Sequence, residues 1–132
     1  MELHKIYSSF KIAKRLAKKQ FYLSEYNKPP FTKEWYNEKG EITNVPTHFP
    51  RTDYFTIRLW LESEGVLFVT DRPQPEGPLF SRVFVRIYDG KKYPPGKEPY
   101  RRRGRIEYFE DYDEAEAATL ERAISAVTPL PF

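Results

Sequence analysis

The stretch TDYFTIRLWLESEGVLFVTD, Thr52–Asp71, decides the fold, because its first part fits two kinds of secondary structure. Apolar side chains at alternate positions from 55 to 61 are typical of a strand, and a hairpin would then turn at ESEG. The residues Ile57, Trp60, Leu61 and Glu64 stand at i, i+3, i+4 and i+7, a spacing that is typical of a helix. The pattern alone leaves these two interpretations even.

The residues at both ends of the segment 54–64, within this stretch, fit the helical interpretation. Thr52 or Asp53 offers a side-chain oxygen to the helix N-terminus, and Gly65 suits the residue that follows a helix. The segment GVLFVT after it is a strand on either interpretation, because it combines aliphatic and aromatic residues with a preceding glycine.

Two other segments have clear helical periodicity. The first runs from Tyr7 to Gln20, with Ser8 or Ser9 as its N-cap. The second starts near Asp111, where Glu114 completes a pattern that resembles a capping box, and stops before Pro129. The expected buried stripes are Ile12, Ala13, Leu16 and Ala17 in the first helix and Ala117, Leu120, Ile124 and Val127 in the second.

The remaining chain reads as short strands and proline-rich connections. Lys33–Ile42 predicts strand, turn and strand, with Gly40 in the turn. LFSRVFVRIY, Leu79–Tyr88, alternates most clearly, with one aliphatic face and one face that is charged with one aromatic. GRIEYF, 104–109, is the last expected strand. We expect an extended stretch from Phe21-Tyr22, loops at 44–51 and 72–78, an irregular Pro/Lys/Arg-rich connection at 89–104, and a short C-terminal tail at 128–132.

The length of 132 residues fits one domain with a modest core. The order of these segments predicts an α+β fold in which a small antiparallel sheet of about four to six strands is packed by about three helices. Trp35 and Trp60 are expected in or near the core. Aromatic residues make up 17% of the chain, more than such a core needs, which leaves room for a homodimer.

Four segments in this order resemble a group of small bacteriophage and prophage proteins of unknown function. They are SFKIAKRLAKKQF, EWYNEKGEI, FPRTDYFTIRLWLESEGVLFVT and YFEDYDEAEAATLERAISAV. The chain departs from the pattern at Gln20, where the group has Gly, at Arg51, and in the proline-rich stretch 89–100. The matching residues are Ala13, Lys14, Leu16, Phe21, Trp35, Tyr36, Gly40, Pro50, Thr52, Ile57, Trp60, Leu61, Tyr112, Ala118 and Ile124.

This resemblance implies the helix at 52–64, an α+β fold and an origin in a phage or mobile element. It transfers no catalytic residue. It implies a non-enzymatic accessory protein that binds a host factor or small ligand, as proteins of host takeover or anti-defence do. The expected location is then the cytoplasm of the bacterial host. A chain without cysteine fits that compartment, and no apolar run approaches the length of a membrane span.

Basic residues gather in two segments and give an alternative hypothesis, a nucleic-acid-binding module. The net charge is only +3, but charges of one sign are grouped along the chain. Residues 72–105 carry ten Lys/Arg against three Asp/Glu, and residues 106–132 carry one against seven. The arginines could clamp phosphates while nearby tyrosines stack on bases, or they could be solvated or paired with the acidic helix. The candidate contact residues are Arg101, Arg102, Arg103, Arg105, Lys11, Lys14, Arg15, Lys18, Tyr93 and Tyr100.

Signals for catalysis and for metal binding are poor. His4 and His48 are far apart and lack ligand spacing, and the chain has no P-loop, GxGxxG or nucleophile elbow. The group Glu107, Glu110, Asp111 and Asp113 could hold Mg²⁺ as hydrolases do, but capping of the last helix explains it as well. We therefore expect no catalytic residues, no metal and no cofactor.

Overall fold

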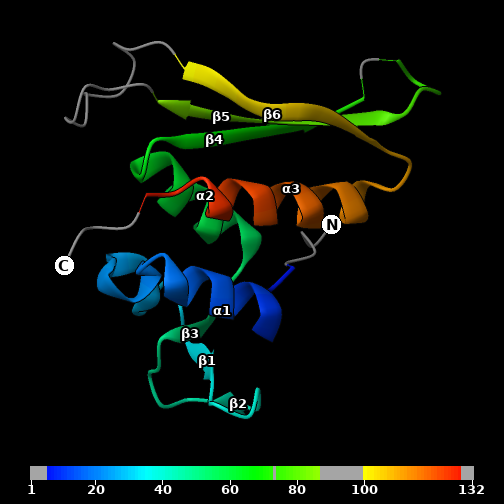
Figure 1. Cartoon of the computed structure of the whole chain (residues 1–132). Coiled ribbons are helices and arrows are strands. Elements are labelled where there is room, and N and C mark those ends of the chain that lie inside the picture. Colours follow the sequence, from blue (N-terminus) through cyan, green and yellow to red (C-terminus); the bar gives the residue numbers. More distant parts are fainter. Residues whose placement is uncertain (1–5, 73, 87–99, 129–132) are drawn as a thin grey trace. The chain divides into compact units, whose positions relative to one another are not determined.

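The computed structural model of the chain describes residues 6–72, 74–86 and 100–128. These residues form three α-helices and six strands, so the predicted α+β class is confirmed (Figure 1). The strands form two antiparallel sheets of three, in the orders β2-β1-β3 and β4-β5-β6, rather than one sheet. The elements are α1 Phe10–Lys18, η1 Phe21–Leu23, η2 Glu25–Asn27, β1 Glu34–Tyr36, β2 Ile42–Thr43, β3 Phe49–Arg51, α2 Tyr54–Ser63, β4 Val66–Asp71, β5 Leu79–Arg86, β6 Tyr100–Phe109 and α3 Tyr112–Ser125.

The chain folds into two compact units. The first comprises Met1–Trp60 with Thr128–Phe132, and the second comprises Leu61–Val127. Helix α2 starts in the first unit and ends in the second. Among the described residues, no helix combines the length and the apolar character that crossing a membrane requires.

The first unit packs α1 against strand β3 of its small sheet. Ser9 caps α1 because its hydroxyl accepts a hydrogen bond from the Ile12 N–H at 3.3 Å, as one of the two predicted caps. Gly40 has φ +82° in the β1–β2 turn, where the sequence placed it. The predicted extended stretch at Phe21 is wrong, since two successive 3₁₀ turns, η1 and η2, occupy Phe21–Asn27.

Strand β3 is the second difference in this unit. The sequence predicts a loop through residue 51, yet Phe49–Arg51 pairs antiparallel with β1, with Pro50 opposite Trp35. Proline is tolerated because β3 is an edge strand, where an N–H that points away from the sheet needs no partner. Trp35 is buried as expected, and its indole N–H donates to Asn27 Oδ1 at 3.2 Å.

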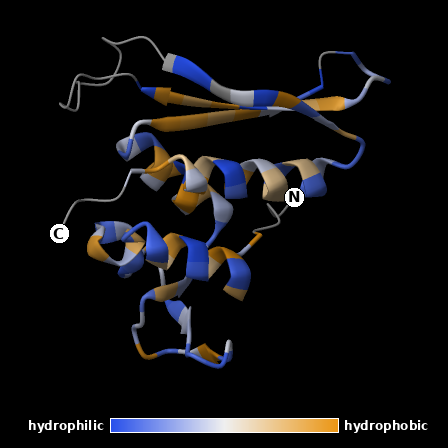
Figure 2. Ribbon diagram, viewed as in Figure 1, coloured by the Kyte–Doolittle hydropathy of each residue, from blue (hydrophilic) through white to orange (hydrophobic). Residues whose placement is uncertain are grey.

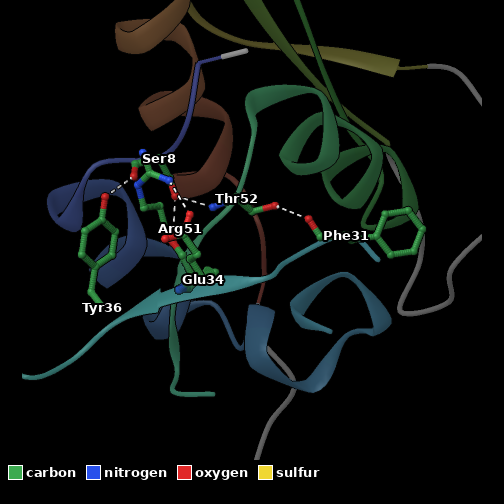
Figure 3. A network of polar contacts seen from close by, with 7 residues as sticks. Ser8, Phe31, Glu34, Tyr36, Arg51 and Thr52 are labelled. Carbon is green, nitrogen blue, oxygen red and sulfur yellow. Dashed lines mark hydrogen bonds and ion pairs between the residues drawn. The ribbon is translucent and has the colours of Figure 1, made fainter. Parts of the chain in front are cut away.

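A buried polar network fastens the segment before α1 to this sheet (Figure 3). The Ser8 hydroxyl donates to the Pro50 carbonyl at 2.7 Å and accepts from the Thr52 N–H at 3.1 Å. The Tyr36 hydroxyl donates to the Ser8 carbonyl at 2.6 Å. At the edge of the network Arg51 pairs with Glu34 at 2.9 Å. Because each of these buried groups has a partner, the network orders the segment without leaving a polar atom unsatisfied there.

The ambiguous stretch is a helix, α2, as the resemblance implied. Asp53 precedes it, and its carboxylate accepts from the Thr56 N–H at 3.2 Å and from the Thr56 hydroxyl at 2.8 Å. Gly65 follows it with φ +81°. The side chain of Trp60 is buried with its ring edge against Phe21, the centroids 5.1 Å apart.

The second unit is a three-stranded sheet with α3 lying across one face (Figure 1). Strand β5 is central and pairs with β4 from Val66–Val85 to Asp71–Phe80. Asp111 caps α3 through the Asp113 N–H at 3.3 Å, and Leu120, Ile124 and Val127 are buried as expected, whereas Ala117 of the same predicted stripe is half-buried. The sequence assigned 100–104 to an irregular connection, but these residues begin the long strand β6. The part of that connection at 89–99 and the tail at 129–132 lie outside the described residues.

Candidate nucleic-acid interface

Strand β6 places Arg101, Arg102 and Arg103 of the predicted segment on a regular ladder with β5, whereas Arg105 lies in the irregular part of the strand. Arg101 pairs with Val85 and Arg102 with Phe84. Since neighbouring residues of a strand point to opposite faces, these two exposed arginines lie on different faces of the sheet. The sequence placed Arg101 and Arg102 in one candidate contact group, whereas the strand puts their side chains on opposite faces of the sheet. Arg103 pairs with Val83 and Tyr100 with Arg86 through the backbone; their side chains, and all of Tyr93, lie outside the described residues.

The other predicted segment, on α1, belongs to the first unit. Lys11, Lys14 and Lys18 are exposed and Arg15 is half-buried, so the helix presents a basic surface as expected. The ammonium of Lys14 lies 4.9 Å from the centre of the Phe10 ring. Helix α1 belongs to the first unit and β6 to the second, so each basic segment is described as a feature of its own unit.

The face of the β4–β6 sheet that points away from α3 carries arginines and aromatic side chains, only some of which the sequence indicated as contact residues. We call it the open face. Its residues follow from strand alternation and register. They are Leu67, Val69 and Asp71 on β4, Phe80, Arg82, Phe84 and Arg86 on β5, and Arg102 and Tyr108 on β6.

Burial confirms which face is which. Val66, Phe68, Leu79, Ser81 and Val83 alternate with the open-face residues and are all buried on the side of α3. On the open face, by contrast, Tyr108 is 65% exposed and Val69 is 41% exposed, while the β5 side chains are half-buried. In Figure 2 strand β4 is coloured as largely hydrophobic, and the first part of β6 contains hydrophilic segments.

Aromatic rings and guanidinium groups alternate across the open face. Tyr108 pairs directly with Phe80, and Arg102 pairs with Phe84. Arg82 lies between the two phenylalanines on β5, with its guanidinium carbon 5.7 Å from the centre of the Phe80 ring. Among the described residues, Nε of Arg82 has no hydrogen-bond partner, so the ring contact is what holds this group.

Of this segment, Arg101 and Arg102 are described residues that the acidic helix does not neutralise. Within the described part of the chain, neither Arg101 nor Arg102 forms an ion pair. Two of the four carboxylates that were weighed as a metal group, and for which capping was the competing explanation, have structural contacts: Asp111 caps α3, and Glu107 pairs with Arg122 at 3.5 Å. The described residues contain no group of three His, Asp or Glu side chains arranged to hold a metal ion.

The side chain of Arg122, on α3, contacts the irregular part of β6 from the side of the sheet that α3 covers. Its terminal nitrogen donates to the Arg105 carbonyl at 3.1 Å, and its other nitrogens lie 3.5 Å from Glu107 and from Ser81 Oγ. Gly104, with φ +73°, leaves room for this side chain, since a Cβ there would lie 3.0 Å from the guanidinium. The contact fixes β6, which carries Arg102 and Tyr108 on its other side.

Sequence reasoning missed Phe80, Arg82, Phe84, Arg86 and Tyr108 as candidate contact residues. The signal was present, because Leu79–Tyr88 alternates charged and aliphatic residues. Their relation to β6 required the pairing register, which the sequence does not give. Of the two histidines, His4 lies outside the described residues, and the ring of His48 stacks on Tyr22 with the centroids 3.9 Å apart.

Comparisons with known proteins add no family: no protein-family model, curated protein or solved structure matches the chain.

Proposed function

We propose that the protein acts by binding nucleic acid on the open face. The observation that carries this proposal is the alternation of guanidinium groups with aromatic rings, one exposed and two half-buried, on one sheet face. Among the described residues of this face, Arg82, Arg86 and Arg102 are positively charged and Asp71 carries a carboxylate. Arginine binds phosphate through a planar fork and stacks on rings, so both parts of a nucleotide find a partner.

Binding by arginines to phosphates must depend strongly on salt, because each contact releases counterions from the nucleic acid. We expect a fluorescent oligonucleotide to bind the full chain at low salt and to dissociate steeply as salt rises. Replacing Arg102 by Ala should weaken binding and reduce the slope of log affinity against log salt by about one.

Arg101→Ala is the matched control. Arg101 neighbours Arg102, is equally exposed and carries the same charge, but it lies on the face of α3. It should change affinity much less than Arg102→Ala does. Equal effects of the two substitutions would place the contact elsewhere than on the open face, and a flat response to salt would contradict the proposal as a whole.

A protein partner is a second candidate, for which a surface in the first unit gives the specific observation. Ile42 is 54% exposed on β2, and Val45 just after it is 67% exposed. Exposed aliphatic neighbours of this kind suit a protein contact. If the chain is a phage accessory protein, as the resemblance suggests, this partner would be a host factor.

This second candidate has its own test. Ile42→Asp with Val45→Asp should abolish capture of a host protein by the immobilised chain, whereas Arg102→Ala should leave the capture unchanged. The reverse pattern would assign any captured protein to the open face and remove the support from this surface.

A further inference from the structure

The rings of the open face form two stations along β5. Tyr108 and Phe80 are direct cross-strand partners and make the first station. Phe84 is four residues further along β5, which puts the second station ~13 Å away at a rise of ~3.3 Å per residue. One planar base cannot cover both stations, so a ligand that uses both must present at least two separate flat groups.

Each station has a cation beside it. Arg82 lies next to the first station, with its guanidinium over the Phe80 ring, and Arg102 is the cross-strand partner of the second. Cross-strand partners have Cβ atoms ~5 Å apart, so ring and cation can contact one nucleotide together. The repeated pairing of a ring with a cation matches the repeat of base and phosphate along a nucleic-acid strand.

A duplex would leave these rings unused. Its bases are stacked on one another inside the helix, and its surface offers mainly phosphates and base edges. Single-stranded nucleic acid exposes the faces of its bases, which stack on aromatic side chains irrespective of sequence. An anion without flat groups would engage the arginines but have no use for the ring of Tyr108, which is 65% exposed.

We propose that the open face is a stacking platform for single-stranded nucleic acid, with bases on Tyr108–Phe80 and on Phe84 and phosphates on Arg82 and Arg102. This inference rests on the proposed function and narrows it to one class of ligand. It assigns recognition to base faces, so the platform accepts many sequences.

The test compares three probes on the unaltered chain: a mixed-sequence single strand of twelve nucleotides, the same sequence as a duplex, and polyphosphate. Fluorescence anisotropy with the labelled single strand, followed by competition with the other two, gives the three affinities. We expect the single strand to bind at least about tenfold more tightly than the duplex or polyphosphate, since stacking on even one ring contributes about that factor.

Substitutions then locate the contact. Tyr108→Ala should weaken single-strand binding about fivefold to a hundredfold without changing the salt slope, because the lost ring carries no charge. Tyr108→Phe should retain the binding. Phe84→Leu, which keeps an apolar side chain at a half-buried position, should weaken it as well. Tyr112→Ala is the matched control, since Tyr112 is 52% exposed on α3 rather than on the open face.

The outcomes separate this inference from the proposed function. Equal binding of duplex, polyphosphate and single strand, with Tyr108→Ala neutral and Arg102→Ala weakened, would overturn the platform and leave phosphate binding intact. No binding of any probe at low salt would overturn both. Tight single-strand binding that depends on Tyr108 and Phe84 would support both.

Discussion

The hydroxyl of Tyr36 is a single group on which a buried network depends. It donates to the Ser8 carbonyl at 2.6 Å, and the Ser8 side chain in turn bonds to residues on both sides of the end of β3. Tyr36→Phe should lower the free energy of unfolding by about 1–2 kcal/mol, because a buried carbonyl loses its partner. Chemical denaturation followed by Trp fluorescence measures this change.

The control for Tyr36→Phe is Tyr22→Phe. The hydroxyl of Tyr22 makes no hydrogen bond among the described residues, and its ring contact with His48 survives the substitution. Tyr22→Phe should leave the free energy of unfolding within about 0.5 kcal/mol of the value of the original chain. A loss as large for Tyr22→Phe as for Tyr36→Phe would contradict the network interpretation.

Gly104 has a positive φ, and its lack of a side chain leaves room for the guanidinium of Arg122. Gly104→Ala meets both a positive φ and the guanidinium of Arg122, so it should destabilise the protein by about 1–2 kcal/mol. Gly77→Ala is a suitable comparison, because Gly77 lacks a positive φ. Thermal unfolding of both variants measures the difference.

The same substitution in an Arg122→Ala background separates the two causes. If the contact with the guanidinium contributes, Gly104→Ala should cost less there than in the original chain, leaving only the backbone strain. Equal costs in the two backgrounds would show that the strain acts alone. A cost no larger than that of Gly77→Ala would contradict the account of Gly104 given above.

At the scale of elements, α2 depends on a cap that the sequence could offer only as one of two choices. Asp53 accepts two hydrogen bonds from Thr56, so Asp53→Ala should lower the free energy of unfolding by about 1 kcal/mol. Asp53→Asn retains an acceptor and should lose less. Circular dichroism during urea denaturation gives both values, and an equal loss for Ala and Asn would speak against capping.

The sequence predicted the elements that are determined locally. The stripes of α1 and α3, the hairpin turn at Gly40 and strand β5 all follow from short-range periodicity and turn chemistry. Strand β3 and the start of β6 could not be predicted in this way. Pro50 and the run of arginines give no alternation, and only pairing with β1 and β5 makes these segments strands.

The candidate site was predictable only in part, for the same reason. The arginines of β6 were found because charge is visible along the chain. The aromatic partners of those arginines lie 18 or more positions away, on β5, and the register that joins Arg102 with Phe84 is a tertiary property. The sequence also grouped Arg101 with Arg102, although strand alternation separates them.

At the scale of the whole molecule, charge is segregated within the second unit. Its sheet carries the arginines of the open face, and its helix α3 carries Asp113, Glu114, Glu116 and Glu121. A unit whose open face is basic and whose helix α3 carries mostly acidic side chains orients an approaching polyanion before contact. If the proposed function holds, salt should slow association more than it speeds dissociation.

Stopped-flow measurements at about 20 and 200 mM salt test this expectation, since the Debye length shortens over that range from about 20 Å to about 7 Å. Glu114→Gln, at an exposed position on α3, should raise the association rate slightly at low salt and leave dissociation unchanged. An effect confined to dissociation would show that charge acts only after contact.

The irregularity in β6 has a consequence for how this chain can change in length. Between the pairs Ser81–Glu107 and Val83–Arg103, β6 has three residues, 104–106, opposite one residue of β5, Arg82. The surplus is two, an even number, so Arg102 and Tyr108 still point the same way on either side of it. Deletion of two of these residues would leave one residue opposite Arg82 and keep that arrangement in a regular strand. Deletion of one would keep the same pairs only as a bulge with two residues opposite Arg82. If the strand slipped by one position instead, Arg102 would turn toward α3 and Arg101 would face outward in its place. A change of two residues in this strand therefore preserves the two sides of the sheet without a bulge, whereas a change of one requires a bulge.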